Sequence, residues 1–268
     1  MTEPQESRLS RRTPLQVQRA VLFALFVRES KGRFGGRWLG IFWVLAEPLA
    51  HLVFLMLVFG AVRRHMLPGI DFPVFLLVGI VPFFTFRNLA LQLMSAVDAN
   101  RGLFGYRQVK PLDTLVSRAM LEVAIYSVVS LSMLFVLGWF GFQWMPAEPL
   151  QLLAVLASVT LLGFGVGLLF AVATDELPNM RAFIRILFMP LYLLSAVMFP
   201  VSALPPELLS WVLWNPVLHA VELSRGYFLP QYHVMPQVSA TYLAMCSLVA
   251  VCAGLALYRV RRHQLLAS

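Results

Sequence analysis

Apolar residues run along the chain in long blocks, and short polar or basic segments separate these blocks. A helix needs about 20 apolar residues to cross the hydrocarbon layer of a membrane, and six of the blocks approach or exceed that length. The pattern predicts an all-α integral membrane protein in which a single transmembrane domain, residues 1–268, carries six transmembrane helices. The predicted spans cover residues 38–62, 72–93, 115–140, 150–174, 184–199 and 240–258.

Three segments outside the predicted spans have patterns of their own. Residues 13–31 alternate apolar with polar and basic side chains but are too few to span, which predicts a basic amphipathic helix lying in the membrane interface. Residues 31–37 then form a Gly-rich basic hinge. Residues 201–237 are apolar but hold five prolines, so we expect a pair of short re-entrant helices there. An aromatic-rich loop on the membrane surface is the alternative for this segment.

Composition and charge support a membrane location and orient the chain. Hydrophobic residues make up 59% of the chain and charged residues only 13%, about half the charged share of a soluble domain. Lys and Arg collect on the cytoplasmic side of membranes, and 17 of the 21 basic residues fall on one side if the six spans alternate. We therefore expect both termini in the cytoplasm. The same bias accounts for the net charge of +8 without a nucleic-acid partner.

The sequence lacks the usual motifs of catalysis and metal binding. Its two lysines, Lys31 and Lys110, do not lie in a Gly-x-x-x-x-Gly-Lys-Ser/Thr phosphate-binding loop. Gly-x-Ser-x-Gly and His-Glu-x-x-His are also absent from it. Cys246 and Cys252 point to different faces of one predicted helix, so they indicate neither a disulfide nor a metal site. We expect no catalytic residue, metal or cofactor in this chain.

Polar residues inside predicted spans are candidates for a translocation path, because each one is costly in hydrocarbon. Glu47 and His51 lie four residues apart on the first span. They could form a proton relay or a polar lining, or a structural pair satisfied by a neighbouring helix. Arg87 in the second span could face an anionic substrate, or pair with Glu47 or Glu122. Trp38 and Trp43 complete the candidate path, since aromatic rings stack on sugars, although an interfacial aromatic belt is the simpler interpretation.

Two further segments suggest contacts with other elements. Gly163 and Gly167 form a Gly-x-x-x-Gly face in the fourth predicted span, which is typical of close helix packing. Residues 98–110 combine basic side chains with two aromatic ones on the connection between the second and third spans. A short basic amphipathic helix of this kind suits docking into a groove of a partner protein, and the alternative is that it lies on lipid headgroups.

Five stretches of the chain, taken in order, resemble the ABC-2 type export permeases, and within them the permeases of capsular polysaccharide transporters. The first is Arg28-Glu-Ser-Lys-Gly-Arg-Phe-Gly-Gly-Arg-Trp-Leu-Gly-Ile-Phe-Trp-Val-Leu-Ala-Glu-Pro48. The others are residues 72–77, 102–113, 213–225 and 256–259. The resemblance covers nearly the whole chain, and the order and spacing of the stretches make it specific.

The resemblance implies an architecture and a set of partners. It implies six spans, an interfacial gate helix over residues 14–30, a coupling helix over 100–108, and re-entrant helices over 205–229. Two copies would form the pathway in the bacterial inner membrane and bind two soluble ATPase subunits, which hold the ATP and Mg. The substrate would be a lipid-linked acidic capsular polysaccharide moved from cytoplasm to periplasm. A periplasmic adaptor and an outer-membrane polysaccharide exporter would continue the route.

Carried over by position, the resemblance assigns residues to three regions. The ATPase-coupling residues would be Asn100, Arg101, Gly102, Leu103, Phe104, Tyr106 and Arg107. The hinge after the gate helix would comprise Lys31, Gly32, Arg33, Gly35, Gly36 and Arg37. The re-entrant region would include Trp211, Trp214, Asn215, Pro216, Glu222 and Arg225.

Two other functions fit parts of the sequence. One is a different ABC-2 exporter, for O-antigen, teichoic acid or a small drug. The other is a secondary carrier driven by a proton gradient through Glu47 and His51, which would work without an ATPase.

Overall fold

The computed structural model describes residues 13–35, 38–63, 69–106, 108–177 and 179–267, and within these ranges the fold is all-helical. Four of the helices, α3, α5, α6 and α10, are long and apolar enough to cross a membrane. The α-helices are α1 (Pro14–Phe34), α2 (Trp38–Arg63), α3 (Phe72–Met94), α4 (Ala96–Asn100), α5 (Pro111–Trp139), α6 (Pro149–Glu176), α7 (Met180–Leu194), α8 (Pro206–Val212), α9 (Pro216–Phe228) and α10 (Ala240–Ala267). Two short 3₁₀ helices are η1 (Arg101–Leu103) and η2 (Val201–Ala203).

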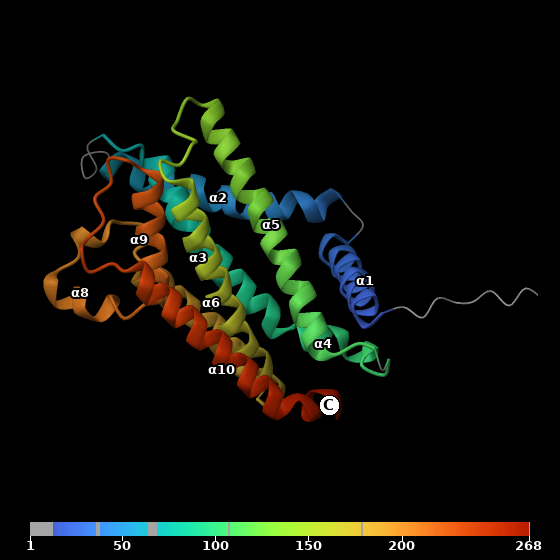
Figure 1. Ribbon diagram of the computed structural model, residues 1–268. Coiled ribbons are helices and arrows are strands. Elements are labelled where there is room, and N and C mark those ends of the chain that lie inside the picture. The colour runs from blue at the N-terminus through green and yellow to red at the C-terminus, as the bar shows by residue number, and fades with distance from the viewer. Residues whose placement is uncertain (1–12, 36–37, 64–68, 107, 178, 268) are drawn as a thin grey trace, which may run out of the picture.

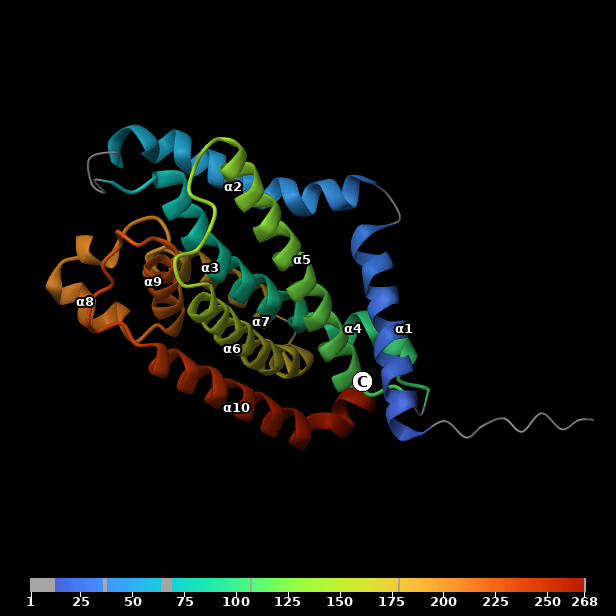
Figure 2. The same cartoon turned by 45° about the horizontal axis from the view of Figure 1, so that its top comes forward.

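Helix α3 forms the centre of the bundle. It packs against α6 on one side and α5 on another, and α10 covers the outer side of α6 (Figure 1). Helix α2 crosses α5 steeply, and α1 lies along the first part of α5 (Figure 2). One end of the bundle lies near α4 and is called here the junction end. It is formed by the adjacent ends of α3, α5, α6, α7 and α10. The connection 140–148, α8 and α9 lie toward the other end, called the far end.

Glycines on α6 allow close packing on two sides. A Cβ at Gly163 would lie 3.2 Å from the Phe86 carbonyl oxygen, and one at Gly167 would lie 2.6 Å from Leu93, so the predicted Gly-x-x-x-Gly face packs against α3. Gly165 faces the opposite way, and a Cβ there would collide with the backbone of Ala250 on α10. The three alternating glycines therefore place α6 tightly between two helices.

The structure differs from the predicted bounds at several places, and α10 continues nine residues past the predicted end, to Ala267. Helix α1 continues through Lys31, Gly32 and Arg33 to Phe34, so the predicted hinge is wrong over these residues. One interior glycine costs a helix only about 1 kcal/mol, and the helix ends instead at Gly35, whose φ of 59° is left-handed. Gly36 and Arg37 lie outside the described residues.

The predicted coupling segment and the fifth predicted span also have bounds that differ from those in the structure. The helical part of the former is residues 96–103 rather than 98–110, and residues 104–106 and 108–110 are turns or coil. Gly102 and Gly105 favour this early end, because glycine is a poor helix former. Helix α7 begins at Met180 and ends at Leu194, five residues before the predicted end.

Arg225 supports the segment that follows the early end of α7. Fifteen helical residues measure about 22 Å, which is less than the hydrocarbon thickness of about 30 Å. The buried carbonyls of the non-helical segment that follows a helix need donors from elsewhere in the protein. The Arg225 guanidinium, 0% exposed, donates to the carbonyls of Ala196 (2.9 Å), Val197 (2.6 Å) and Phe199 (3.2 Å) just after α7. It therefore supplies donors to carbonyls of residues that are largely buried away from water.

The charge of Arg225 is balanced inside the same cluster. Glu222 accepts a hydrogen bond from Arg225 at 3.0 Å, and the Tyr232 hydroxyl donates to both Glu222 carboxylate oxygens, at 2.9 and 2.7 Å. The Phe75 ring of α3 lies 3.7 Å from the guanidinium carbon, a cation–π arrangement. Burial and the Glu222 carboxylate raise the pKa of the Tyr232 phenol. The cluster joins α9, α3 and the segment after α7 into one unit.

We predict that Gly165→Ala lowers the thermal unfolding midpoint of the detergent-solubilised protein and its amount in membranes. The added methyl group would collide with the α10 backbone, and such overpacking costs about 1–3 kcal/mol. Gly32→Ala is the matched control, because a Cβ there meets nothing within 4 Å. An unchanged midpoint for Gly165→Ala would contradict the assigned α6–α10 packing.

We also predict that Arg225→Met strongly destabilises the protein. It leaves three carbonyls without donors and Glu222 without its countercharge, and losing one partner of a buried ion pair costs about 3–5 kcal/mol. Membrane abundance and thermal unfolding would be measured beside Arg185→Met, a control at an exposed position of α7. Equal stability of the two variants would show that the carbonyls find other donors.

Candidate functional site

The described polar side chains gather most densely at the junction end, around the segment 96–103. This segment contains α4 and η1, and side-chain bonds join it to α1, α6 and α7, while α5 packs beside it. We call these residues the junction cluster, and it has two halves. One half joins α1 and α5 to Asn100, and the other joins α6 and α7 to Asp98 and Arg101.

The first half is built around a buried carboxylate. Glu29 of α1 is 6% exposed, and its two oxygens contact Arg118 of α5 at 2.6 Å and the Asn100 amide nitrogen at 2.6 Å. Asn100 in turn accepts a hydrogen bond from Arg28 at 2.7 Å and donates to the Ala96 carbonyl at 2.9 Å. Asn100 is fully buried and therefore links the gate helix predicted from the sequence to the predicted coupling segment.

The second half is a chain of ion pairs. Arg101 lies 2.6 Å from Asp175 at the end of α6 and 2.8 Å from Asp98. Asp98 also pairs with Arg181 at the start of α7. The sequence assigned Arg101 to docking, whereas the structure shows it bonded within the chain. A charge reversal at Arg101 would thus disturb the fold as well as any contact with a partner.

The exposed tip of the connection lies beyond the helical part. Tyr106 is 66% exposed, and Gly102, Gln108 and Lys110 are exposed beside it. Phe104 is half-buried against the core near α5 and α6, and Leu103 is also half-buried. Arg107 lies outside the described residues. Of the two aromatic side chains predicted as anchors, only Tyr106 is free to meet another molecule.

Helix α1 lies parallel to the beginning of α5. Gln18 donates to Asp113 at 2.6 Å near the start of both helices, and Arg33 lies 3.6 Å from Glu122, about four turns further along α1 and two to three turns further along α5. A capping box of Thr13 and Gln16 starts the helix. Its position in the membrane interface stays a prediction, but its attachment to α5 is well defined.

The candidate path residues come together in part, because the His51 ring and the Arg87 guanidinium both lie against the Phe84 ring. His51 Nε2 lies 2.8 Å from the Tyr192 hydroxyl of α7, whereas Glu47 is exposed. Arg87 stacks at 5.6 Å over the Phe84 ring and forms no ion pair with Glu47 or Glu122 among the described residues.

Neither the aromatic path candidates of α2 nor the possible metal ligands define a site among the described residues. Trp43 is 65% exposed, and the side chain of Trp38 lies outside the described residues. Within the described part of the chain, His, Cys, Asp and Glu side chains do not form a group that could hold a metal ion.

The predicted re-entrant region contains two short helices at the expected positions, α8 and α9. Asn215 caps α9 by accepting from the Val217 N–H at 3.0 Å, and Pro216 occupies the first helical position. Trp211 and Trp214 are each 78% exposed, in contrast to the buried pair Glu222 and Arg225.

His219 is a residue that sequence reasoning missed. Its Nε2 donates to the Leu213 carbonyl at 2.8 Å, and its Nδ1 accepts from the Ser239 N–H at 2.9 Å, so the neutral ring joins α9 to the start of α10. Only its position three residues after the Asn-Pro helix start could have suggested this role.

Residues 20–229 match the family model of the ABC-2 type transporter. The chain belongs to this ABC-2 family. It is 42% identical over 257 residues to the polysialic acid transport protein KpsM of Escherichia coli, covering 96% of this chain and 99% of the relative. It is 30% identical to the capsule polysaccharide export inner-membrane protein CtrC of Neisseria meningitidis serogroup A, over 90% of this chain and 91% of the relative. BexB of Haemophilus influenzae, of the same description, is 27% identical over 80% of this chain and 81% of its own length.

Family membership identifies the class of protein in which the junction cluster lies. ABC-2 chains are membrane subunits of transporters rather than enzymes themselves. The described structure has four membrane-length apolar helices, and the cluster ties a connection between two of them, α3 and α5, to several neighbours.

We predict that Asn100→Ala loosens α1 without unfolding the bundle. It removes bonds to Glu29 and Arg28, and a lost buried hydrogen bond costs about 1–3 kcal/mol, so amide hydrogen exchange in α1 should speed up roughly tenfold. Exchange in α10 should not change. Gln151→Ala, at an exposed position of α6, is the control. Unaltered protection of α1 would mean that Asn100 does not hold it.

Proposed function

We propose that this chain is the transmembrane permease subunit of an ABC exporter for capsular polysaccharide, located in the bacterial inner membrane. The observation that carries the proposal is the likeness to the E. coli polysialic acid transport protein, which extends over nearly the full length of both chains. Two further relatives with capsule polysaccharide export in their descriptions support the same substrate class.

The transported molecule is a lipid-linked acidic polysaccharide that moves from cytoplasm to periplasm. Helices α2 and α7 complete six spans with the four long apolar helices, and both termini lie in the cytoplasm with the junction end. The basic residues in the last turns of α10 and those of α1 support this orientation, because they lie on the side where positive charge accumulates. Arg87 and the exposed Trp43 remain candidates for contact with the polymer.

A separate ATPase supplies the energy and binds ATP and Mg, since the sequence of this chain has no phosphate-binding loop. Two copies of the permease form the pathway and two ATPase subunits dock on the tip around Tyr106. Asn100 and Arg101 would then pass movement of this tip to α1, α6 and α7 through the junction cluster. A periplasmic adaptor and an outer-membrane exporter take the polymer onward.

The proposal is tested first by loss and restoration of surface polymer. Deleting the gene should abolish capsule at the cell surface and leave polymer inside the cell, and the full chain expressed from a plasmid should restore export. Purification of the tagged chain in mild detergent should yield a soluble ATPase in equal amount. Normal capsule after deletion would refute the substrate class, and an active chain without any ATPase would favour the proton-driven carrier.

We predict that Tyr106→Glu reduces co-purification of the ATPase and export at least tenfold while the permease stays abundant. The side chain is exposed, so the change adds a charge at the proposed contact without opening the fold. Gln151→Glu introduces the same charge on an exposed position of α6 and serves as control. Full ATPase recovery with Tyr106→Glu would place the docking site elsewhere.

A further inference from the structure

Arg87 lies within the membrane-length helix α3 and has no anionic partner in the described part of the chain. Its guanidinium lies over the Phe84 ring, and hydrogen bonds or ion pairs to other described residues are absent. The buried Arg225, in contrast, pairs with Glu222 and donates to three carbonyls. Charged side chains inside membrane helices pair with other groups or face a water-filled cavity. Arg87 is therefore available to a ligand.

Two hydrogen-bonding side chains from other helices lie close to the same ring as Arg87. The His51 ring of α2 lies 5.2 Å from the Phe84 ring, and the Arg87 guanidinium lies 5.6 Å from it. The Tyr192 hydroxyl of α7 lies 2.8 Å from His51 Nε2 and keeps a lone pair for a second donor. Phe84 is 5% exposed, whereas the three polar side chains around it are half-buried, so a ligand can reach them. Three helices thus present a cation and two polar groups around one buried ring, and we call this group the Phe84 site.

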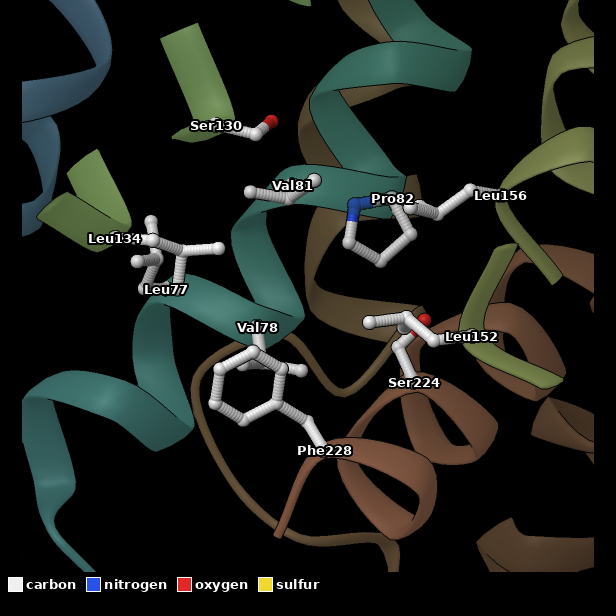
Figure 3. Close-up of a pocket in the computed structure, with 10 residues that line it drawn as sticks. All are labelled: Leu77, Val78, Val81, Pro82, Ser130, Leu134, Leu152, Leu156, Ser224 and Phe228. Atoms are coloured by element: carbon white, nitrogen blue, oxygen red, sulfur yellow. The ribbon is translucent and has the colours of Figure 1, made fainter. Parts of the chain in front are cut away.

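The Phe84 site begins where one face of α3 changes from apolar to polar. Toward the far end, α3 side chains between Leu77 and Pro82 line a crevice with α5, α6 and α9 (Figure 3). This crevice holds about 60 Å³ and its surface is apolar, so it offers nothing to a charged ligand. Toward the junction end, Asn88 donates to the Tyr126 hydroxyl of α5. The polar groups on this face therefore lie around Arg87 and not in the crevice.

This arrangement fits a carboxylate carried by a sugar. We propose that the Phe84 site binds an acidic sugar of the transported polymer, whose carboxylate accepts two hydrogen bonds from Arg87 and whose hydroxyl group donates to Tyr192. The inference rests on the proposed function, which supplies an acidic polymer to the permease. The planar guanidinium matches the geometry of a carboxylate, and His51 holds the Tyr192 hydroxyl in place. The site therefore selects acidic sugars over neutral ones.

The depth of Arg87 favours a transported sugar over the phosphate of a bilayer lipid. Arg87 lies seven residues from the end of α3 at Met94, which is about 10 Å along the helix. The other end of α3, at Phe72, is fifteen residues or about 22 Å away. Phospholipid headgroups lie at the two surfaces of the hydrocarbon layer, whereas a polymer that crosses the protein passes every depth. A transported carboxylate can therefore reach Arg87.

Binding of short fragments of the cell's own capsule polymer tests the proposal. The fragments would carry a fluorophore at one end and would be used intact or with their carboxylates reduced to alcohols. The permease, with any ATPase that co-purifies, would be kept in an uncharged detergent, and dissociation constants would be measured by fluorescence anisotropy. The wild type should bind intact fragments at least tenfold more tightly than reduced ones. Arg87→Gln should bind both forms equally, whereas Arg185→Gln, at an exposed position of α7, should keep the full preference.

Two further variants test the parts of the site. Arg87→Lys keeps the charge without the paired donors, so it should retain only part of the preference for intact fragments. Tyr192→Phe removes a hydroxyl group but no charge, so it should weaken the binding of both forms by a similar factor. If Arg87→Gln failed to accumulate in membranes, an undiminished preference in Arg87→Lys would still refute the two hydrogen bonds to the carboxylate.

Export measurements separate this proposal from the proposed function. In the deletion strain, the wild-type chain should restore surface polymer, and Arg87→Gln should restore at least tenfold less at equal membrane abundance. Arg87 has only a ring contact within the described part of the chain, so its loss should not unfold the protein. No restoration by the wild type would refute the proposed function, whereas equal restoration by both chains would refute the Phe84 site alone.

Each other outcome overturns the proposal. Equal binding of intact and reduced fragments by the wild type would show that carboxylates are not recognised. A preference kept by Arg87→Gln would place the anion site elsewhere. Recovery of export when Glu47→Gln is added to Arg87→Gln would show that Arg87 neutralises Glu47 within the chain.

Discussion

Buried backbone carbonyls outside a helix have no water to bond, and this constraint shapes the far half of the protein. Helix α7 stops after fifteen residues. The buried guanidinium of Arg225 donates hydrogen bonds to carbonyls of the segment that follows it. Glu222, Tyr232 and Phe75 then hold the guanidinium itself. The position of α9, the turn after α7 and the neighbouring face of α3 all depend on this one cation. A membrane protein can interrupt a helix only where the freed backbone groups find partners in the protein or in a water-filled cavity.

The long helices could be predicted from the sequence because hydrocarbon requires an unbroken apolar run of a known length. Helices α2, α3 and α6 lie within one or two residues of their predicted bounds. Helix ends were less predictable where tertiary bonds outweigh local preference. Gly32 was interpreted as part of a hinge, yet the contact of Arg33 with Glu122 lies one residue further along a continuous helix.

The residues of the site were harder to predict than the helices. Arg101 was singled out because it lies on a basic connection and Asn100 through the family resemblance, but each also has a partner more than seventy residues away along the chain. Composition and spacing within one sequence do not show such pairings. The burial of Arg225 was equally hard to predict, since a lone arginine between prolines and aromatic residues suggests an exposed position. The family resemblance located the correct segments without identifying which side chains point inward.

Segment 96–103 has a mechanical consequence that follows from its number of attachments. Its side chains are bonded to α1, α6 and α7, and α5 is tied to the same group through Glu29. Four helices that share one short anchor have few independent degrees of freedom, so they should tilt together as a rigid body. Among the described residues, α2 has no bond to this anchor. It is joined to α7 through the hydrogen bond between His51 and Tyr192 and packs on α3, so a tilt of the four helices would reach α2 only through these indirect contacts.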